Sequence, residues 1–305
     1  MGRRTFLSML LTLVLACPAL GADFVTVGFW NIEHLGATNS AQRPIALAEY
    51  IAASGVDVLG LCEIYDTDDG PERRNEQLDT AFAILNEEDD VEWKYELLPN
   101  RDADDRSQLC AIAWNAKQVT REGNAFPIDF DDDPNDEFFL WDRKPHAVKF
   151  STGNGRTDFV VIPVHMKSNV KPRDQARARG RTGEEFGAGQ RELEAAALVA
   201  KLNDVRTHFG GEQDLIILGD TNIKRHTEKA VELITDAGFV DLNIEDFDTY
   251  LGDGAPFDRI FVSISKEFVF TRQRVLVDSA PKEHREYLSD HYAISTTFRT
   301  KTDDD

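Results

Sequence analysis

Residues 214–222 read DLIILGDTN, an apolar run that ends in an acid, Asp220, with Asn222 two positions beyond. A short run rich in Leu and Ile that stops at turn-forming residues is typical of a β-strand. Asp, Asn and Gly are common turn formers, so the stretch also fits an ordinary transition from strand to turn. The sequence therefore predicts a strand here, and it raises the question of whether other strands end in the same way.

Several other apolar runs carry an acid, an amide or an imidazole at one end. Strands that each deliver such a group place them together at a common rim, where loops converge on a substrate. Taken singly, each of these residues also fits a polar strand exit, a helix cap or a surface histidine. The joint pattern favours a functional site. Besides Asp220 and Asn222, its members are Asn31, Glu33, Glu63, His165, Asp258, Asp290 and His291.

The rest of the chain alternates β-rich runs with helical segments, without an internal repeat or a Gly/Ser/Pro linker. Ten strands and four helices in one unbroken chain predict two packed β-sheets flanked by helices. We expect strands over 24–31, 56–63, 93–99, 109–114, 146–150, 158–165, 214–220, 257–263, 268–277 and 292–298. We expect helices over 41–54, 73–87, 184–208 and 227–237.

The first 22 residues are predicted to form a secretory signal peptide. Two arginines precede the apolar run FLSMLLTLVLA, which is short for a transmembrane span and is followed by small residues. We expect cleavage near Ala22 and export to the periplasm or the medium, with lipid modification at Cys17 as the less favoured alternative. The remainder is expected to be one catalytic domain, residues 23–300, followed by an acidic tail, residues 301–305.

The composition is that of an ordinary soluble globular protein, with 41% hydrophobic residues. The formal net charge is −21, and the pI is near 4.7. Such a chain does not hold polyanions through its whole-surface field, although a local basic groove remains compatible with it. Cations gather in one place, the stretch KSNVKPRDQARARGR directly after an apolar run that ends in histidine. A solvated loop is the ordinary interpretation, and a docking site for a polyanion is the one we favour. The six cations are Lys167, Lys171, Arg173, Arg177, Arg179 and Arg181.

Two cysteines, Cys62 and Cys110, remain outside the predicted signal peptide. They are too few for a disulfide framework even in an oxidising compartment. Each lies within an apolar, strand-like run, VLGLCEI and QLCAIAW. We predict two small buried hydrophobic residues, with a single disulfide left open if the two strands are neighbours.

Seven motifs span residues 25–298: FWNIE, LCE, RKPHAVKF, VHMKSN, LGDTN, FDRIFVS and SDHYAI. In kind and order they resemble the endonuclease/exonuclease/phosphatase superfamily, which includes pancreatic-type deoxyribonuclease, abasic-site endonucleases, bacterial sphingomyelinases and inositol-phosphate phosphatases. The segment FLWDRKPHAVKFST is most similar to the pancreatic type, and HMKS to secreted bacterial relatives. The resemblance implies an α+β fold, a four-layer α/β/β/α sandwich of two mixed sheets, and phosphoester hydrolysis.

The resemblance also implies a metal centre. Glu63 matches the metal-ligand glutamate of the family, with Glu33 and Asp290 in or near the same shell. Asn31 is expected there too, and as a substrate-binding residue. These hard oxygen ligands suit Mg²⁺ or Mn²⁺, which neutralises phosphate charge. A structural Ca²⁺ stays open, although the acidic runs tested do not have the spacing of an EF-hand loop.

The same resemblance gives roles to the remaining rim residues. Asp220 and Asn222 would position or activate the attacking water and hold a phosphoryl oxygen. His291 would serve as base or phosphate-binding imidazole, oriented by Asp258. His165 would bind the phosphate from the other side or protonate the leaving oxygen. Further expected substrate-binding residues are Arg143, as a forked cation, and Lys167, Lys171 and Arg173.

One segment departs from the pancreatic type. Where those enzymes carry a Tyr that packs into the DNA minor groove and a Glu paired with histidine, residues 102–109 read DADDRSQL and match neither. The loop IDFDDDPNDE also lacks the Cys pair found near this point. We still expect the fold and the phosphoester chemistry of the family, but we do not expect binding in the groove of a DNA duplex.

Three functions are weighed on this basis. The first is an exported, divalent-metal-dependent phosphodiesterase, a monomer that cleaves DNA or RNA as an endonuclease by in-line attack of water. The second is a phosphatase or sphingomyelinase-type hydrolase of a small or lipid phosphoester. The one aromatic cluster for membrane contact, FFLW at 138–141, fits a core strand equally well, and no stable membrane association is expected. The third, a binding module, requires a lost catalytic position, and none is lost.

Overall fold

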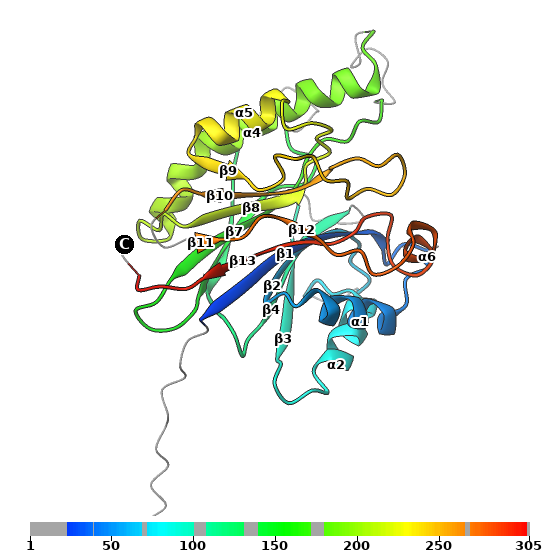
Figure 1. The fold of residues 1–305 in the computed structure, drawn as a ribbon, viewed down its shortest axis with the longest axis vertical. Coiled ribbons are helices and arrows are strands. Elements are labelled where there is room, and N and C mark those ends of the chain that lie inside the picture. Colours follow the sequence, from blue (N-terminus) through cyan, green and yellow to red (C-terminus); the bar gives the residue numbers. More distant parts are fainter. Residues whose placement is uncertain are drawn as a thin grey trace, which may run out of the picture.

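The computed structural model describes residues 23–38, 40–68, 72–100, 108–130, 140–171, 180–265 and 269–303. Within these residues, two β-sheets pack face to face, and helices cover both outer faces (Figure 1). The predicted four-layer α/β/β/α sandwich is confirmed. The predicted signal peptide, most of DADDRSQL and the central part of the basic run, with Arg173, Arg177 and Arg179, lie outside the described residues.

Each sheet is mixed, with one parallel pair of strands. The first sheet runs through β11 (Val269–Phe270), β13 (Ile294–Arg299), β1 (Phe24–Leu35), β2 (Val58–Ile64), β4 (Leu109–Asn115) and β3 (Trp93–Leu98), and β12 (Arg274–Val275) also pairs with β13. The second sheet runs through β5 (Thr120–Pro127), β6 (His146–Ser151), β7 (Asp158–His165), β8 (Leu215–Asp220), β10 (Asp258–Ser263) and β9 (Phe239–Asp241). The parallel pairs are β1 with β2 and β7 with β8.

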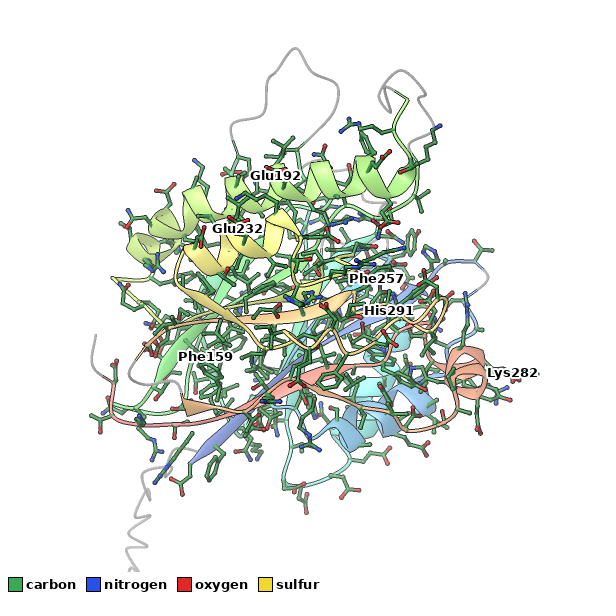
Figure 2. All side chains as sticks on the ribbon, turned by 45° about the horizontal axis from the view of Figure 1, so that its top comes forward. Phe159, Glu192, Glu232, Phe257, Lys282 and His291 are labelled. Carbon is green, nitrogen blue, oxygen red and sulfur yellow. The ribbon has the colours of Figure 1, made fainter. Side chains whose placement is uncertain are left out.

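The helices form the two outer layers. On the first sheet lie α1 (Pro44–Ser54) and α2 (Glu76–Leu85), with α6 (Pro281–Tyr287) beside α1. On the second sheet lie α4 (Gly183–His208) and α5 (Lys229–Asp236) (Figure 1). Figure 2 shows Phe159 within the sandwich and Glu192 and Glu232 on the helical layer that covers the second sheet. None of the described helices is long and apolar enough to cross a bilayer.

The central strands are buried on both faces, which explains their nearly continuous apolar sequences. In β8, Ile216 and Leu218 pack between the two sheets, while Leu215 and Ile217 pack in the cluster beneath α4 and α5. Each such side chain contributes about 1.5–3 kcal/mol by its burial. A Cβ atom on Gly60 of β2 would lie 2.4 Å from Leu218 Cδ1, so a larger residue there would displace the Leu218 side chain from the core between the sheets.

Most predicted elements are confirmed, and one is wrong. The expected strand over 268–277 is two short strands, β11 and β12. Between them the side chain of Gln273 accepts a hydrogen bond from Ile260 N (3.0 Å) and donates one to Asp258 O (3.0 Å). These bonds tie residue 273 to β10 of the other sheet, which interrupts pairing with β13. The elements β5, β9 and α6 were not predicted, because β5 is polar and largely exposed, and β9 and α6, with 3 and 7 residues, are too short to show a clear periodicity.

The two cysteines are buried and unpaired, although β2 and β4 are neighbours in the first sheet. Cys62 and Cys110 both belong to the core between the sheets. Burial raises the pKa of the Cys110 thiol to about 12, so the group stays protonated and inert at neutral pH. The interpretation as small buried hydrophobic residues is confirmed, and the structure contains no disulfide between them.

Candidate active site

The sheet topology brings the polar strand ends together at one rim. Across the parallel strands β7 and β8, His165 is in register with Asp220. Across the antiparallel strands β8 and β10, Asp220 is in register with Asp258, since β10 begins where β8 ends. In the first sheet β1 and β2 are parallel, so the ends that carry Asn31 and Glu63 also meet. The rim therefore consists of the carboxyl ends of both parallel pairs and the amino end of β10.

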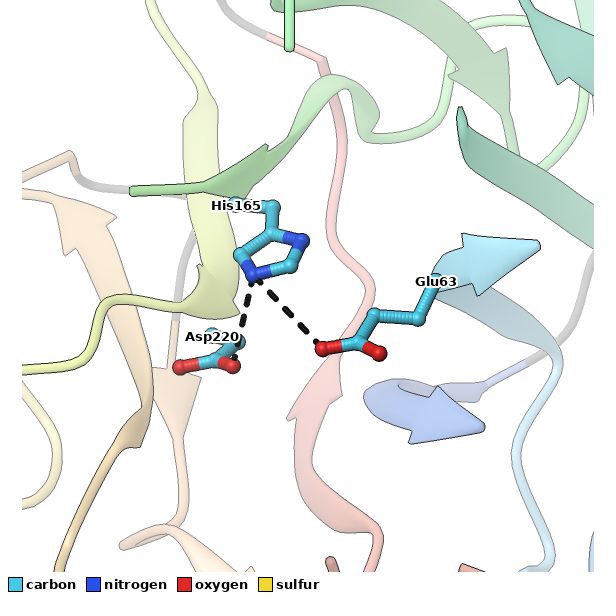
Figure 3. A group of neighbouring side chains, drawn as sticks. All are labelled: Glu63, His165 and Asp220. Atoms are coloured by element: carbon cyan, nitrogen blue, oxygen red, sulfur yellow. Dashed lines mark ion pairs between the residues drawn. The ribbon is translucent and has the colours of Figure 1, made fainter. Parts of the chain in front are cut away.

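Three side chains at this rim form a candidate metal centre: Glu63, His165 and Asp220 (Figure 3). One ligand atom from each lies within 4.8 Å of the others. His165 Nε2 is 3.9 Å from Glu63 Oε1 and 3.7 Å from Asp220 Oδ2, which is too long for hydrogen bonds. Asn31 Nδ2 donates to both carboxylates, at 3.0 Å each. Two carboxylates and an imidazole facing a common gap fit a divalent cation.

The other two predicted metal ligands lie outside this group: Asp290 lines the same pocket, Glu33 lines a neighbouring one, and both face an arginine. Arg285 Nη2 is 3.5 Å from Glu33 Oε1 and 3.7 Å from Asp290 Oδ2. Burial raises the pKa of Asp290 to about 6; the charge of His291 opposes this, and repulsion from Glu33 and Glu63 adds to it. Asp290 is thus repelled by both glutamates, and a cation bound nearby would relieve that repulsion.

His291 and Asp258 form a buried pair. Asp258 Oδ2 accepts a hydrogen bond from His291 Nδ1 at 2.7 Å, which turns Nε2 toward Asp220 and Asp290, 3.9 Å from each. Burial disfavours the charged ring, but the carboxylates of Asp258, Asp220 and Asp290 outweigh it and raise the pKa of His291 to about 10. The ring is therefore protonated at neutral pH, and its Nε2–H is a donor facing the pocket.

Asp220, unlike His291, has a pKa near neutrality. Burial raises the pKa of Asp220 to about 7; His291 opposes this rise, and Asp258 and Glu63 add to it. Its Oδ1 accepts a hydrogen bond from the backbone N of Asn222 at 2.9 Å, which orients the carboxylate. A carboxyl group that titrates near neutral pH suits a general base.

His165 is kept neutral. Burial, together with the positive charges of Arg143 and His291, lowers the pKa of His165 well below its ordinary value. Its Nδ1 is buried and has no hydrogen-bond partner among the described residues. A neutral imidazole is the form that ligates metals. The ring is thus suited to offer a lone pair or a hydrogen bond, and is a poor proton donor.

Backbone strain gathers at this rim. Among the described residues, five that are not glycine have a positive φ, and four of these five lie at the rim. These four are Glu33 (29°), His34 (58°), Glu63 (61°) and Asn222 (54°). Such conformations cost about 1–3 kcal/mol each and persist where the surrounding structure enforces them, typically at functional sites.

Gln108, which was not among the predicted site residues, connects two of them. Arg143 Nη2 donates to Gln108 Oε1 at 2.6 Å, and Gln108 Nε2 donates to Glu63 Oε2 at 2.8 Å. Gln108 Nε2 also lies 2.7 Å from His34 Nδ1. The sequence does contain a feature that indicates its position. Gln108 directly precedes an apolar strand, β4, that runs antiparallel to β2, so it lies at the same rim as Glu63.

The residues of the rim line a pocket of about 430 Å³, and its wall includes His165, Asp220 and His291. Phe257 forms part of its wall and lies beside His291, as Figure 2 shows. Cations occur at its edge, but two of them are paired. Lys167 pairs with Asp142, and Lys224 lies 3.4 Å from Glu184 and 3.7 Å from Asp253. Lys171 is exposed and directly follows Val170, which lines the pocket.

Comparison with known proteins gives one family and several similar folds. The model of the Endonuclease/Exonuclease/phosphatase family matches residues 28–291. A protein of that family from Bacteroides thetaiotaomicron is 17% identical, with 92% of this chain and 99% of that chain covered and a TM-score of 0.63. A mannosyl-6-phosphatase from the same organism is 18% identical (89% and 98% covered, TM-score 0.62), and truncated TDP2 from Caenorhabditis elegans is 16% identical (90% and 98%, TM-score 0.56). At these identities the likeness concerns the fold alone. No curated protein matches the sequence significantly.

Proposed function

The chain belongs to the endonuclease/exonuclease/phosphatase family of divalent-metal-dependent phosphoester hydrolases, and from this premise we propose that it hydrolyses phosphodiester bonds of nucleic acid. One observation carries the proposal. The buried Asp258–His291 pair faces the candidate metal centre across a single pocket, and Asp220 lies within 4 Å of both histidines. A base, an imidazolium and a cation site thus converge on one point, as hydrolysis of a phosphoester requires.

The residues present fit a divalent cation, which we propose to be Mg²⁺ or Mn²⁺. Glu63, Asp220 and His165 would hold it, with Glu33 and Asp290 as further oxygen ligands of the site. When bound, such an ion neutralises phosphate charge and stabilises the developing oxyanion. Asn31 keeps the two carboxylates oriented through its amide, which donates to both.

Side chains of the protein would carry out the proton transfer and bind the phosphoryl oxygens. Asp220 would position the attacking water or accept its proton, since the backbone N of Asn222 orients its carboxylate at the cation site. His291 donates its Nε2–H to a phosphoryl oxygen, and Asp258 maintains its charge. Asn222 binds a second phosphoryl oxygen, and Arg143, held by Gln108, supplies a cation from the other side. His165 offers a hydrogen bond or a lone pair, because its neutral form is favoured.

Nucleic acid as the substrate is supported by the cations that follow His165 and by the pancreatic-like segment around Arg143. A second candidate, a small phosphoester, is favoured by one observation. Lys167 and Lys224 at the pocket edge are already paired with carboxylates, which reduces their attraction for a polyanion. We further propose that residues 1–22 direct export and that the protein acts as a monomer outside the cytoplasm.

The test uses purified protein with plasmid DNA, RNA, bis-p-nitrophenyl phosphate, sphingomyelin and a sugar phosphate, each with Mg²⁺, Mn²⁺ or EDTA. We expect metal-dependent cleavage of DNA or RNA, and at least 100-fold less in His165→Ala and His291→Ala, a loss typical of removing a group that stabilises the transition state. Cleavage of the sugar phosphate alone would establish the second candidate. Absence of any hydrolysis with either metal would refute both.

A further inference from the structure

Two ionisable side chains of α4, Arg191 and Glu194, are buried beneath the loop that follows His165. Their exposed fractions are 0% and 1%. Burying a polar or charged group is costly unless it is hydrogen-bonded, so the hydrogen-bond partners indicate the role of these side chains. Both side chains bind the backbone of one residue of the loop. Glu194 Oε2 accepts from Lys167 N at 2.9 Å, and Arg191 Nη1 donates to Lys167 O at 2.9 Å.

Arg191 also reaches the active site through one intermediate residue. Its Nη1 donates to Asn169 Oδ1 at 3.0 Å, and Asn169 Nδ2 donates to Asn222 O at 2.9 Å. The side chain of Asn222 returns to the same loop, with Nδ2 donating to Met166 O at 3.2 Å. Asn222 has a φ of 54°, a conformation that needs such external support.

The rest of the Arg191 guanidinium holds the loop that follows β8. Its Nε and Nη2 donate to Glu228 Oε2 at 3.2 and 2.7 Å. Glu228 Oε1 in turn accepts from Lys224 N at 2.8 Å. One planar fork therefore connects the loops after β7 and β8, the two strands that carry His165 and Asp220. A lysine in its place would keep the charge and lose this geometry.

Two glycines let α4 approach the loop this closely. A Cβ atom on Gly183 would lie 2.3 Å from Asn169 O, and one on Gly187 would lie 2.7 Å from Ser168 O. Real Cβ atoms do not make such contacts with backbone oxygens, so the loop lies directly against the bare backbone of the helix. The first turns of α4 thus form a fixed base under the pocket wall, which includes Ser168 and Asn169.

We propose that Arg191 is a positioning residue, which acts through Asn169 to hold Asn222 and the pocket wall in the arrangement that phosphoester hydrolysis needs. The inference rests on the proposed function for its activity readout. Arg191 is fully buried and so does not touch the substrate. Its effect is therefore transmitted by Asn169, and the two residues should behave as one unit when they are substituted.

The test compares Arg191→Lys, Asn169→Ala and the double variant on bis-p-nitrophenyl phosphate with Mn²⁺. Displacing reactive groups by about 1 Å costs up to about 100-fold in rate, so we expect each single variant to lower kcat about 10-fold to 100-fold with KM nearly unchanged. The double variant should be no slower than the slower single variant, because both remove the same connection. Arg206→Lys, the same exchange near the other end of α4, is the matched control and should keep the wild-type kcat.

A wild-type kcat in Arg191→Lys, or losses that multiply in the double variant, would overturn the proposal. If Arg191→Lys fails to fold by circular dichroism, Gly187→Ala replaces it, and a wild-type kcat there has the same consequence. Amide hydrogen exchange supplies a readout without hydrolysis. We expect residues 166–171 and 221–224 to lose protection in the variant. Lost protection in a protein that cleaves no phosphoester would refute the proposed function and retain the positioning role; unchanged protection would refute the positioning role.

Discussion

Asn31 Nδ2 lies 3.0 Å from Asp220 Oδ2, although the two residues are 189 positions apart and belong to different sheets. The same nitrogen donates to Glu63 Oε1, so one amide bridges two carboxylates. The bridge lies where the carboxyl ends of the two parallel strand pairs meet. It holds two like charges close together, an arrangement that a cation would stabilise further.

Asn31→Asp should therefore impair hydrolysis. The substitution removes the donor and places a third carboxylate beside Glu63 and Asp220, with almost no change in volume. Loss of a hydrogen bond to a charged group costs about 1.5–3 kcal/mol, which predicts about a 10-fold to 100-fold fall in kcat/KM. Steady-state rates with Mn²⁺ titration measure it. Asn203→Asp, an exposed site on α4, is the control. Equal rates in Asn31→Asp and wild type would contradict the bridging role.

Asp258→Asn should shift the alkaline limb of the pH profile. The charge of Asp258 helps to raise the pKa of His291 to about 10, against the effect of burial. Without that charge the ring loses its proton at a lower pH, so activity that depends on the imidazolium should decline at a lower pH than in wild type. Profiles of kcat/KM against pH measure the shift, with the exposed Asp248→Asn as a control. An unchanged alkaline limb would show that His291 does not act in its charged form.

The positions of the rim residues followed from the sequence because each ends an apolar run. A run buried on both faces has few places for a charge, and Glu63, His165 and Asp220 occupy such ends. The side-chain hydrogen bonds between loops at the rim could not be predicted in this way. The hydrogen bond from Arg143 to Gln108, for example, joins residues 35 positions apart across two loops, and no local pattern specifies it.

Buried polar side chains within an amphipathic helix were also invisible in the sequence. Arg191 and Glu194 lie at the same helical spacing as the buried Leu198 and Leu202, but charged residues are ordinarily exposed, and the partners that allow their burial come from a loop distant in sequence. The split of the expected strand over 268–277 has the same origin. Its cause is the side chain of Gln273, which binds the backbone of the other sheet. Local propensity predicts elements, whereas these features depend on the docking of elements that are distant in sequence.

Glu194 should make stability fall as pH rises. Burial raises the pKa of Glu194 to about 8, against the opposing hydrogen bond from Lys167 N. Between about pH 4.3, the unfolded value, and pH 8, the folded state binds the proton more tightly than the unfolded chain does, so its stabilising effect is lost as pH rises through this window. Glu194→Gln removes the titration and keeps an acceptor. Urea unfolding from pH 5 to 8 should show a smaller decline in the variant, by up to about 1.4 kcal/mol per pH unit. The exposed Glu192→Gln is the matched control, and parallel curves for wild type and Glu194→Gln would contradict the prediction.

Lys171 offers the sharpest separation between the two candidate substrates. The side chain is exposed near the pocket edge, and the chain continues from it into the remaining cations of the basic run. An exposed lysine that contacts a phosphate of a polymer binds it by displacing counterions, and its loss reduces the salt dependence of binding by about one unit of log–log slope. Lys171→Ala should therefore raise KM for DNA or RNA and flatten its increase with salt, while KM for bis-p-nitrophenyl phosphate stays the same, because that small diester does not extend to this edge. Lys201→Ala, on α4, is the control. A variant whose KM for nucleic acid and salt dependence both equal those of wild type would exclude Lys171 from substrate binding and favour the small phosphoester.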